Sequence, residues 1–245
     1  MTQHLFISDL HLSADEVDRV QLFLHFLTVR APLAKSLYIL GDLFDAWLGD
    51  DNQQAPIPEV KLALRQLTES GVKLTLMHGN RDFLIGEHFC QETGADLLND
   101  PSLIDLFGTP TLLMHGDLLC SDDQAYQQFR REIRAPAFVS QFLSLPIEQR
   151  ITVAKEYRAK SGEANSLKSD AIMDVNQQTV EDYLSNYQAE SIIHGHTHRP
   201  ADHHFPLADK KASRHVLGEW LNGTAEFICV TAEGLQREKI TLLGF

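Results

Sequence analysis

The sequence contains little cysteine, and the cysteines that it has are not grouped. Cys90, Cys120 and Cys229 are the three present in 245 residues, and no two of them form a Cys-x-x-Cys pair. This pattern excludes a disulfide framework and a zinc knuckle built from cysteine pairs. It is typical of a protein that works in a reducing compartment, and we expect the cytoplasm.

Long apolar runs are also missing. No stretch approaches the roughly 18 consecutive apolar residues that mark a membrane-spanning helix. At the N-terminus, the apolar segment 5–7 is too short for the core of a secretory leader. We therefore expect neither a membrane span nor secretion through a leader, whereas peripheral contact with a membrane surface stays open.

Basic residues are scarce relative to acidic ones, 21 against 34, which gives a formal net charge of −13. A general nucleic-acid binder is excluded, because nonspecific binding of phosphates requires clustered lysine and arginine. Residues 128–169 depart from this acidic balance, with four glutamates and eight basic residues: Arg130, Arg131, Arg134, Arg150, Lys155, Arg158, Lys160 and Lys168. This segment is predicted to meet an anion.

What the sequence does contain is an alternation of apolar strands and amphipathic helices. Strands are predicted at 5–8, 37–40, 72–77, 103–106, 111–114, 191–193, 227–231 and 240–243, and helices at 14–31, 58–69, 83–98 and 179–187. The first helix is predicted to begin with a capping box formed by Ser13 and Glu16. With 43% hydrophobic residues, the chain is long enough for one large α/β domain or two small ones.

The segment 118–170 breaks this alternation, because it has helix-forming residues but no alternating strand pattern. Large apolar residues such as Phe138 and Phe142 are mixed there with basic residues. We interpret the segment as a helical insertion that caps the sheets. An ordinary amphipathic hairpin is the alternative, but a segment that is both apolar and net basic suits a ligand with an apolar part and an anionic part.

Polar side chains with metal-binding chemistry follow several of the strands. Asp42 comes after strand 37–40 and Gly41, at the kind of strand end where α/β sheets place their chemistry. Asp9 and His11 follow the first strand, and their i, i+2 spacing lets both side chains point to one side of an extended chain. For each motif alone, a turn or an exposed strand end is the alternative interpretation.

Three further strand ends carry comparable residues. Asn80 follows strand 72–77, and His115 follows strand 111–114. After strand 191–193 comes Gly195-His196-Thr197-His198, the most specific motif, because packing rarely explains two histidines directly after a buried strand. Other polar residues are predicted to be structural or to lie in exposed loops: Asp50, Asp51, His78, His203 and His204.

Together the strand ends supply only oxygen and imidazole ligands: Asp9, His11, Asp42, Asn80, His115, His196 and His198. This set suits Mn²⁺, Fe or Zn²⁺ better than Ca²⁺, and it is larger than one ion needs. Two ions about 3.5–4 Å apart, bridged by Asp42, would use all of these ligands. Such a pair activates water for in-line displacement at phosphorus, so the predicted reaction is hydrolysis of a phosphate ester or anhydride.

The ordered motifs Asp9-x-His11, Gly41-Asp42-x-x-Asp45, Gly79-Asn80, His115 and Gly195-His196-x-His198 resemble the calcineurin-like metallophosphoesterase superfamily. The resemblance implies a four-layer α/β/β/α sandwich. It also implies one metal held by Asp9, His11, Asp42 and His198, a second held by Asp42, Asn80, His115 and His196, and a supporting role for Asp45. One position departs from the pattern: Arg81 stands where many members have histidine, and it is expected to stabilise charge in that histidine's place.

A narrower resemblance extends over nearly the whole chain. Five motifs are similar to the branch that hydrolyses UDP-2,3-diacylglucosamine in lipid A biosynthesis: Gly79-Asn80-Arg81-Asp82, Ser121-Asp122-Asp123, Ser161-x-x-x-Asn165-x-x-Lys168-Ser169, Ile172-Met173-Asp174-Val175 and Gly195-His196-Thr197-His198-Arg199-Pro200. This resemblance implies Mn²⁺-dependent attack of water on the pyrophosphate, which releases lipid X (2,3-diacylglucosamine 1-phosphate) and UMP. The implied catalytic residues are Asn80, Arg81 and His196, and the implied substrate contacts are Asn80, Arg81, Asp123, Ser161, Asn165, Lys168 and His196.

A lipid substrate implies peripheral contact with the cytoplasmic face of the inner membrane. Residues 1–245 are expected to form a single domain, with the cap inserted at about 118–170, and to act as a monomer that binds no nucleic acid. Two alternatives stay open: a metallophosphoesterase for a soluble nucleotide or phosphoester, and a non-catalytic protein that keeps the fold as a scaffold. The second is disfavoured because every predicted metal ligand is present.

Overall fold

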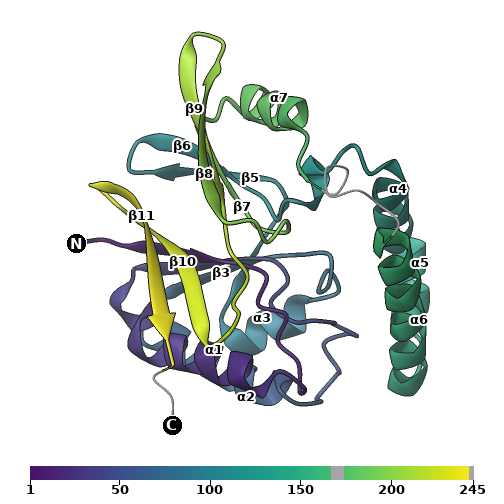
Figure 1. The fold of residues 1–245 in the computed structure, drawn as a ribbon. Coiled ribbons are helices and arrows are strands. Elements are labelled where there is room, and N and C mark those ends of the chain that lie inside the picture. Colours follow the sequence, from purple (N-terminus) through teal and green to yellow (C-terminus); the bar gives the residue numbers. More distant parts are fainter. Residues whose placement is uncertain (167–173, 243–245) are drawn as a thin grey trace.

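Two β-sheets form the body of the molecule, and helices lie outside them (Figure 1). The computed structural model describes the backbone of residues 1–166 and 174–242, and the side chains of these residues except 158–166.

The six-stranded sheet has the order β11-β10-β1-β2-β3-β4. Its strands are β1 (His4–Ile7), β2 (Ser36–Leu40), β3 (Lys73–Met77), β4 (Asp96–Leu98), β10 (Thr224–Thr231) and β11 (Gly234–Thr241). Strands β1 to β4 are parallel, and β10 runs antiparallel to β1. The crossovers contain α1 (Val17–Val29), the 3₁₀ helix η1 (Ala31–Leu33), α2 (Ile57–Glu69) and α3 (Glu87–Thr93). The carboxyl ends of β1, β2 and β3 therefore meet at one edge.

The five-stranded sheet has the order β5-β6-β7-β9-β8. Its strands are β5 (Ser102–Leu106), β6 (Thr109–Leu113), β7 (Ser191–His194), β8 (Ala201–Leu207) and β9 (Lys210–Val216). Strands β6, β7 and β9 are parallel to one another. The 3₁₀ helix η2 (Asp117–Leu119) follows β6, and α7 (Gln177–Tyr187) leads into β7.

Side-chain alternation along the strands separates the layers. Leu5 and Ile7 of β1 belong to the core shared with α1, α2 and α3, whereas Phe6 belongs to the core between the sheets. In β7, Ile193 faces the same central core, while Ile192 packs in a third core with α7. The predicted four-layer α/β/β/α sandwich is therefore confirmed, with α7 as the outer layer on the second sheet.

Three helices fill the described part of the predicted insertion: α4 (Gln124–Ile133), α5 (Pro136–Leu143) and α6 (Ile147–Ser166). They stand beside the sandwich rather than on either sheet (Figure 1). We call α4, α5 and α6 the helical cap. Across the part of the chain that the structure describes, no helix has both the length and the apolar character needed to cross a bilayer.

Two predicted helices are wrong in extent. Helix α1 begins at Val17, and Glu16, its N-cap residue, makes no side-chain capping bond. The preceding Leu12 is still paired with Phe44, so the chain needs a turn at residues 13–16 before it can become helical. The predicted helix 83–98 is reduced to α3, because Gly94 ends it in a left-handed conformation and residues 96–98 pair with β3 as a strand.

Candidate metal centre and substrate pocket

Loops that follow neighbouring strands are joined directly by backbone hydrogen bonds. The backbone N–H of Asp9 donates to the carbonyl of Gly41 at 3.1 Å, and that of His11 donates to the carbonyl of Asp42 at 2.9 Å. In the second sheet, the N–H of Gly195 donates to the carbonyl of His115 at 2.8 Å. The backbone bonds fix the relative positions of ligands that lie far apart in the sequence.

The two sheets meet at Asp9. Its Oδ2 atom accepts the backbone N–H of His196 at 2.9 Å and the Ser8 hydroxyl at 2.5 Å. Gly195 allows this approach, because a Cβ atom added there would collide with the Asp9 carboxylate and with Ser8. The glycine before His196 is thus required by close packing between the two sheets.

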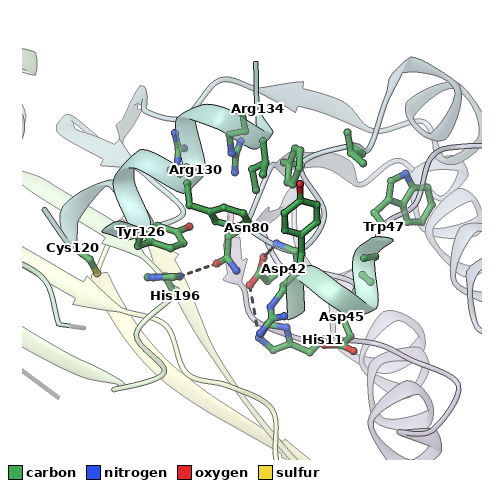
Figure 2. A pocket seen from close by; sticks show the side chains of 18 of the residues that line it. His11, Asp42, Asp45, Trp47, Asn80, Cys120, Tyr126, Arg130, Arg134 and His196 are labelled. Carbon is green, nitrogen blue, oxygen red and sulfur yellow. Dashed lines mark hydrogen bonds and ion pairs between the residues drawn. The ribbon is translucent and has the colours of Figure 1, made fainter. Parts of the chain in front are cut away.

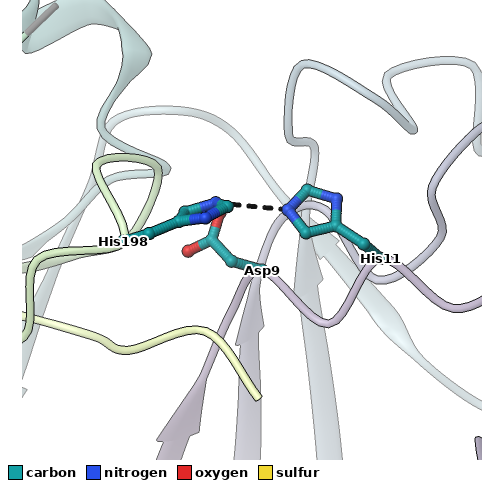
Figure 3. Close-up of side chains that lie close together, drawn as sticks. All are labelled: Asp9, His11 and His198. Carbon is teal, nitrogen blue, oxygen red and sulfur yellow. Dashed lines mark hydrogen bonds and ion pairs between the residues drawn. The ribbon is translucent and has the colours of Figure 1, made fainter. Parts of the chain in front are cut away.

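Three predicted ligands converge at the first of two groups (Figure 3). The Nε2 atoms of His11 and His198 lie 3.2 Å apart, and Nε2 of His198 lies 3.4 Å from Oδ1 of Asp9. That Oδ1 atom is buried and has no hydrogen-bond partner among the described residues. A buried carboxylate oxygen that accepts no hydrogen bond and faces two imidazole nitrogens fits a divalent metal ion.

A second group forms around Asn80. Its Oδ1 atom lies 3.0 Å from Nε2 of His115 and 2.9 Å from Nδ1 of His196, and Figure 2 shows the contact with His196. An amide oxygen with two imidazole nitrogens is again a ligand set for a transition metal.

Asp42 lies between the two groups. Its Oδ2 atom is 3.9 Å from Nε2 of His11, and its Oδ1 atom is 3.8 Å from Nε2 of His115. Each carboxylate oxygen therefore faces a different group, which is the arrangement that a bridging ligand requires. All seven predicted ligands are brought together in a site of the dimetal type.

The electrostatics of the site favour a bound cation. Burial raises the pKa of the Asp42 carboxyl to about 7, and the nearby Asp82 and Asp9 add to this effect while His115 opposes it. At His115, burial lowers the pKa, but Asp42, Asp117 and Asp9 outweigh burial and raise the pKa to about 9. Since several buried carboxylates share this small space, a divalent cation would stabilise their charged forms.

Asp82 holds the loops that carry Asp42 and Asn80. Its carboxylate is fully buried and accepts backbone N–H groups from Asp42 at 3.2 Å, Leu43 at 2.7 Å and Gly79 at 2.8 Å. The sequence motif contained Asp82, but no local pattern indicated that it joins two loops. Two of its three partners, Asp42 and Leu43, are about 40 residues away and could not be identified without the fold.

A pocket of about 610 Å³ opens next to the ligands. One wall consists of His11, Asp42, Asn80, Arg81, His196 and His198, and Asp45 also lines the pocket. The other wall comes from the helical cap and contains aromatic and basic side chains: Tyr126, Phe129, Arg130, Arg134, Phe138, Phe142 and Tyr157. Figure 2 shows Tyr126, Arg130 and Arg134 on this wall. The pocket therefore joins a ligand-rich end to a largely apolar end.

Arginines attach the helical cap to the body. Arg130 donates to Oδ2 of buried Asp117 at 2.6 Å, and Arg134 donates to the carbonyl of Gly79 at 2.7 Å. Arg150 is 6% exposed and donates to Asp51 and to the carbonyls of residues 48, 143 and 145. Some of the predicted basic residues thus meet carboxylates and carbonyls of the protein itself.

The structure describes the side chains of some predicted substrate contacts but not of others. Asn80, Arg81, Asp123 and His196 line the pocket, and Asp123 also caps α4 by accepting the N–H of Tyr126 at 3.0 Å. Ser161 and Asn165 belong to α6, but their side chains lie outside the described residues, as does Lys168 entirely.

Of the residues predicted to be structural or exposed, some lie as predicted and others do not. His78 is structural, since its Nε2 atom lies 2.7 Å from the carbonyl of Ile85. Asp50 is not a solvated acid, because its carboxylate accepts the N–H groups of Gly86 and Phe89 and so caps α3. Asp51 is paired with Arg150 at 2.6 Å.

The comparison with known families agrees with this geometry. The family model for calcineurin-like phosphoesterases matches residues 4–200. The chain belongs to the calcineurin-like phosphoesterase family. An archaeal phosphodiesterase of solved structure aligns with 98% of this chain and 100% of its own, with a TM-score of 0.51 and 11% identity, which shows the shared fold alone.

Within the family, the chain is similar to proteins named UDP-2,3-diacylglucosamine hydrolase. The protein of this name from Serratia proteamaculans is 49% identical over 216 residues, which cover 88% of this chain and 90% of the relative. The one from Haemophilus ducreyi is 46% identical over 236 residues, covering 96% of this chain and 99% of the relative.

Proposed function

We propose that this chain hydrolyses the pyrophosphate bond of UDP-2,3-diacylglucosamine, releasing 2,3-diacylglucosamine 1-phosphate and UMP, as a step of lipid A biosynthesis. The observation that carries the proposal is the single pocket that joins a dimetal-type site to the aromatic wall of the helical cap. A pyrophosphate between a nucleoside and a diacylated sugar needs both surfaces at once. Similarity to proteins named for this substrate supports the same assignment.

The proposed cofactor is a pair of Mn²⁺ ions. Asp9, His11, Asp42 and His198 would hold one ion, and Asp42, Asn80, His115 and His196 would hold the other. When bound, such a pair supplies Lewis acidity and a water of lowered pKa for displacement at phosphorus. The oxygen and imidazole donors described above, without a thiolate, support this choice of metal.

Binding of the substrate and stabilisation of charge are assigned to residues of this chain. The backbone N–H of Arg81 donates to Oδ1 of Asp42 at 2.8 Å, and its side chain lines the pocket beside Asn80. We assign to the guanidinium the binding of phosphoryl oxygens and the stabilisation of their developing charge. We assign to Asn80 and His196 contact with the same phosphate, and to Asp123, Ser161, Asn165 and Lys168 contact with the rest of the substrate.

The acyl chains are assigned to the helical cap. Phe138 and Phe142 stack with ring centroids 6.2 Å apart, and Phe138 meets Tyr157 edge to face at 5.9 Å. Apolar chains that leave water against this wall would contribute binding energy in proportion to the buried area. The proposed protein is a monomeric single domain with the cap inserted at about 118–170, bound peripherally to the cytoplasmic face of the inner membrane.

The test is hydrolysis of UDP-2,3-diacylglucosamine by the purified protein in detergent with Mn²⁺. Para-nitrophenyl phosphate and bis(para-nitrophenyl) phosphate serve as soluble reference substrates. We expect rapid release of UMP that requires the metal, with kcat/KM far above that for either reference ester. Turnover confined to the soluble esters would contradict the lipid assignment while leaving the phosphoesterase class intact.

A further inference from the structure

Glu219 touches a predicted metal ligand from a part of the chain that contains no recognised motif. It lies between β9 and β10, beyond residues 4–200 that the family model matches. Its Oε2 atom is 2.8 Å from Nδ1 of His198, and the Glu219 side chain is 21% exposed. The contact is therefore short and partly shielded from water.

The two nitrogens of His198 face opposite partners. On one side, Nδ1 lies 2.8 Å from Oε2 of Glu219. On the other side, Nε2 lies 3.4 Å from Oδ1 of Asp9 and 3.2 Å from Nε2 of His11, and Figure 3 shows these three residues. An ionised carboxylate only accepts hydrogen bonds, so Nδ1 carries the hydrogen in this contact. The lone pair of a neutral His198 is then left on Nε2, which points at the metal group.

Glu219 is itself held in place by Arg19 of α1. The guanidinium lies 3.6 Å from Oε1 of Glu219, while its NH1 group donates to the carbonyl of Leu10 at 3.2 Å. Leu10 separates Asp9 from His11 in the sequence. Arg19 thus links the carboxylate behind His198 to the loop that carries the other two ligands of the same group.

The partner of His198 differs in kind from that of His115. The Nδ1 atom of His115 lies 2.9 Å from the carbonyl of Leu40, a backbone group that no substitution removes. The orientation of His198 depends on one side chain, which makes it open to a direct test.

We propose that Glu219 is a positioning residue that fixes the ring orientation and the tautomer of His198 for the metal ion shared with Asp9 and His11. This inference rests on the proposed metal site. Carboxylate partners of metal-binding histidines generally set the orientation and basicity of the ligand. The Glu219 side chain also lines the pocket, but the role that we assign to it acts through Nδ1 of His198.

The test measures binding of Mn²⁺ alone to metal-free protein, with the free Mn²⁺ signal followed by electron paramagnetic resonance. Glu219→Ala is expected to lower the affinity for one of the two Mn²⁺ ions about 10–100-fold. Glu219→Gln retains an acceptor oxygen for Nδ1 and is expected to keep most of the affinity. If Glu219→Ala does not fold, Glu219→Met takes its place, because it keeps the side-chain length without an acceptor oxygen.

Glu238→Ala is the matched control. Glu238 also joins the C-terminal part of the chain to an arginine next to α1, with Arg30 donating to it at 2.8 and 2.9 Å. It is expected to leave Mn²⁺ binding unchanged while removing a comparable ion pair. A loss of affinity in Glu238→Ala equal to that in Glu219→Ala would reduce the role of Glu219 to general stability and overturn the proposal.

A double-mutant cycle with His198→Ala separates positioning from an independent effect. If Glu219 acts through His198, the Glu219→Ala change has no further effect on Mn²⁺ affinity once His198 is gone. Additive losses, or wild-type affinity in Glu219→Ala, would contradict the inference. Failure of the wild-type protein to bind Mn²⁺ would instead contradict the proposed metal site, so the two failures are distinguishable.

Discussion

The metal centre and the helical cap are built in opposite ways. Ligands of the metal centre come from loops after five strands, and backbone hydrogen bonds join these loops, as between Asp9 and Gly41 or Gly195 and His115. The helical cap stands beside the sandwich (Figure 1), and arginine side chains attach it, including Arg130 and Arg150. One region depends on the backbone of the sheets, and the other depends on individual side chains.

This difference separates metal binding from recognition of the lipid. The ligand geometry follows from the fold, so any member with the same strand ends can present the same metal-binding edge. The cap adds an aromatic and basic wall that the metal chemistry does not need. Substitutions in the metal centre should therefore affect every substrate, whereas substitutions in the cap should affect the lipid substrate selectively.

The largest effect is expected from Asp42→Ala. Because the two oxygens of Asp42 face different ligand groups, its removal should weaken both ions and bring hydrolysis of lipid and soluble esters below detection. Elemental analysis after dialysis and assays with both substrate types measure this outcome. Asp105→Ala, at an exposed position of β5, is the control. Retention of both ions would show that Asp42 is not a bridge.

Arg81→Ala should separate charge stabilisation from metal binding. Its backbone contact with Asp42 does not depend on the side chain, so metal content should stay at the wild-type level. Loss of a preorganised donor at the phosphoryl group should lower kcat about 10²–10³-fold on all substrates. Rate measurements at saturating Mn²⁺, beside elemental analysis, check the prediction; a metal-free variant would contradict this division of roles.

Phe138→Asp should impair hydrolysis of the lipid substrate but not of soluble esters. A charge among Phe142 and Tyr157 would have to be desolvated when an acyl chain binds, so kcat/KM for the lipid should fall about 10–100-fold, equivalent to roughly 1–3 kcal/mol. Soluble esters should be hydrolysed at the wild-type rate. Ser140→Asp adds the same charge at an exposed position of α5 and serves as control. Equal losses on both substrate classes would contradict the separation of tasks.

The smallest effect on catalysis is expected from Arg150→Ala. Removing the guanidinium leaves the carbonyls of Leu48, Leu143 and Leu145 without this donor, at about 1–3 kcal/mol for each buried group that finds no other partner. Urea denaturation should show lower stability, and lipid turnover should fall less than in Phe138→Asp. Arg65→Ala removes an exposed pair on α2 and should change stability by less than about 1 kcal/mol. Equal stability of the two variants would show that Arg150 does not anchor the cap.

The predicted ligands were found from the sequence because each one follows a strand directly. A short apolar run, a glycine and a polar residue form a local pattern, as at Gly41-Asp42 and Gly195-His196, and parallel strands bring such ends to one edge. The strands predicted at 227–231 and 240–243 correspond to β10 and to the end of β11, and these two strands are paired antiparallel.

The residues that support the ligands carry no such local signal. Glu219 and Asp82 resemble ordinary acidic residues until the fold places them beside His198 and Asp42. The sequence predicts an exposed loop at His203 and His204, but both lie in edge strand β8, where their backbone pairs with β9. The surroundings of these residues depend on contacts between segments far apart in the sequence, and local sequence patterns do not predict such contacts.

Left-handed backbone conformations concentrate at the ligands. Asp9, His11, Asp42, His196 and His198 all have φ between 48° and 69°, a range that costs a residue with a side chain about 1–3 kcal/mol. At these positions the proposed ligand role requires a side chain, whereas the backbone conformation favours glycine. In a descendant freed from its substrate, glycine or asparagine in place of His11 would remove this backbone cost, so selection for folding alone would not retain that ligand while the sandwich would remain.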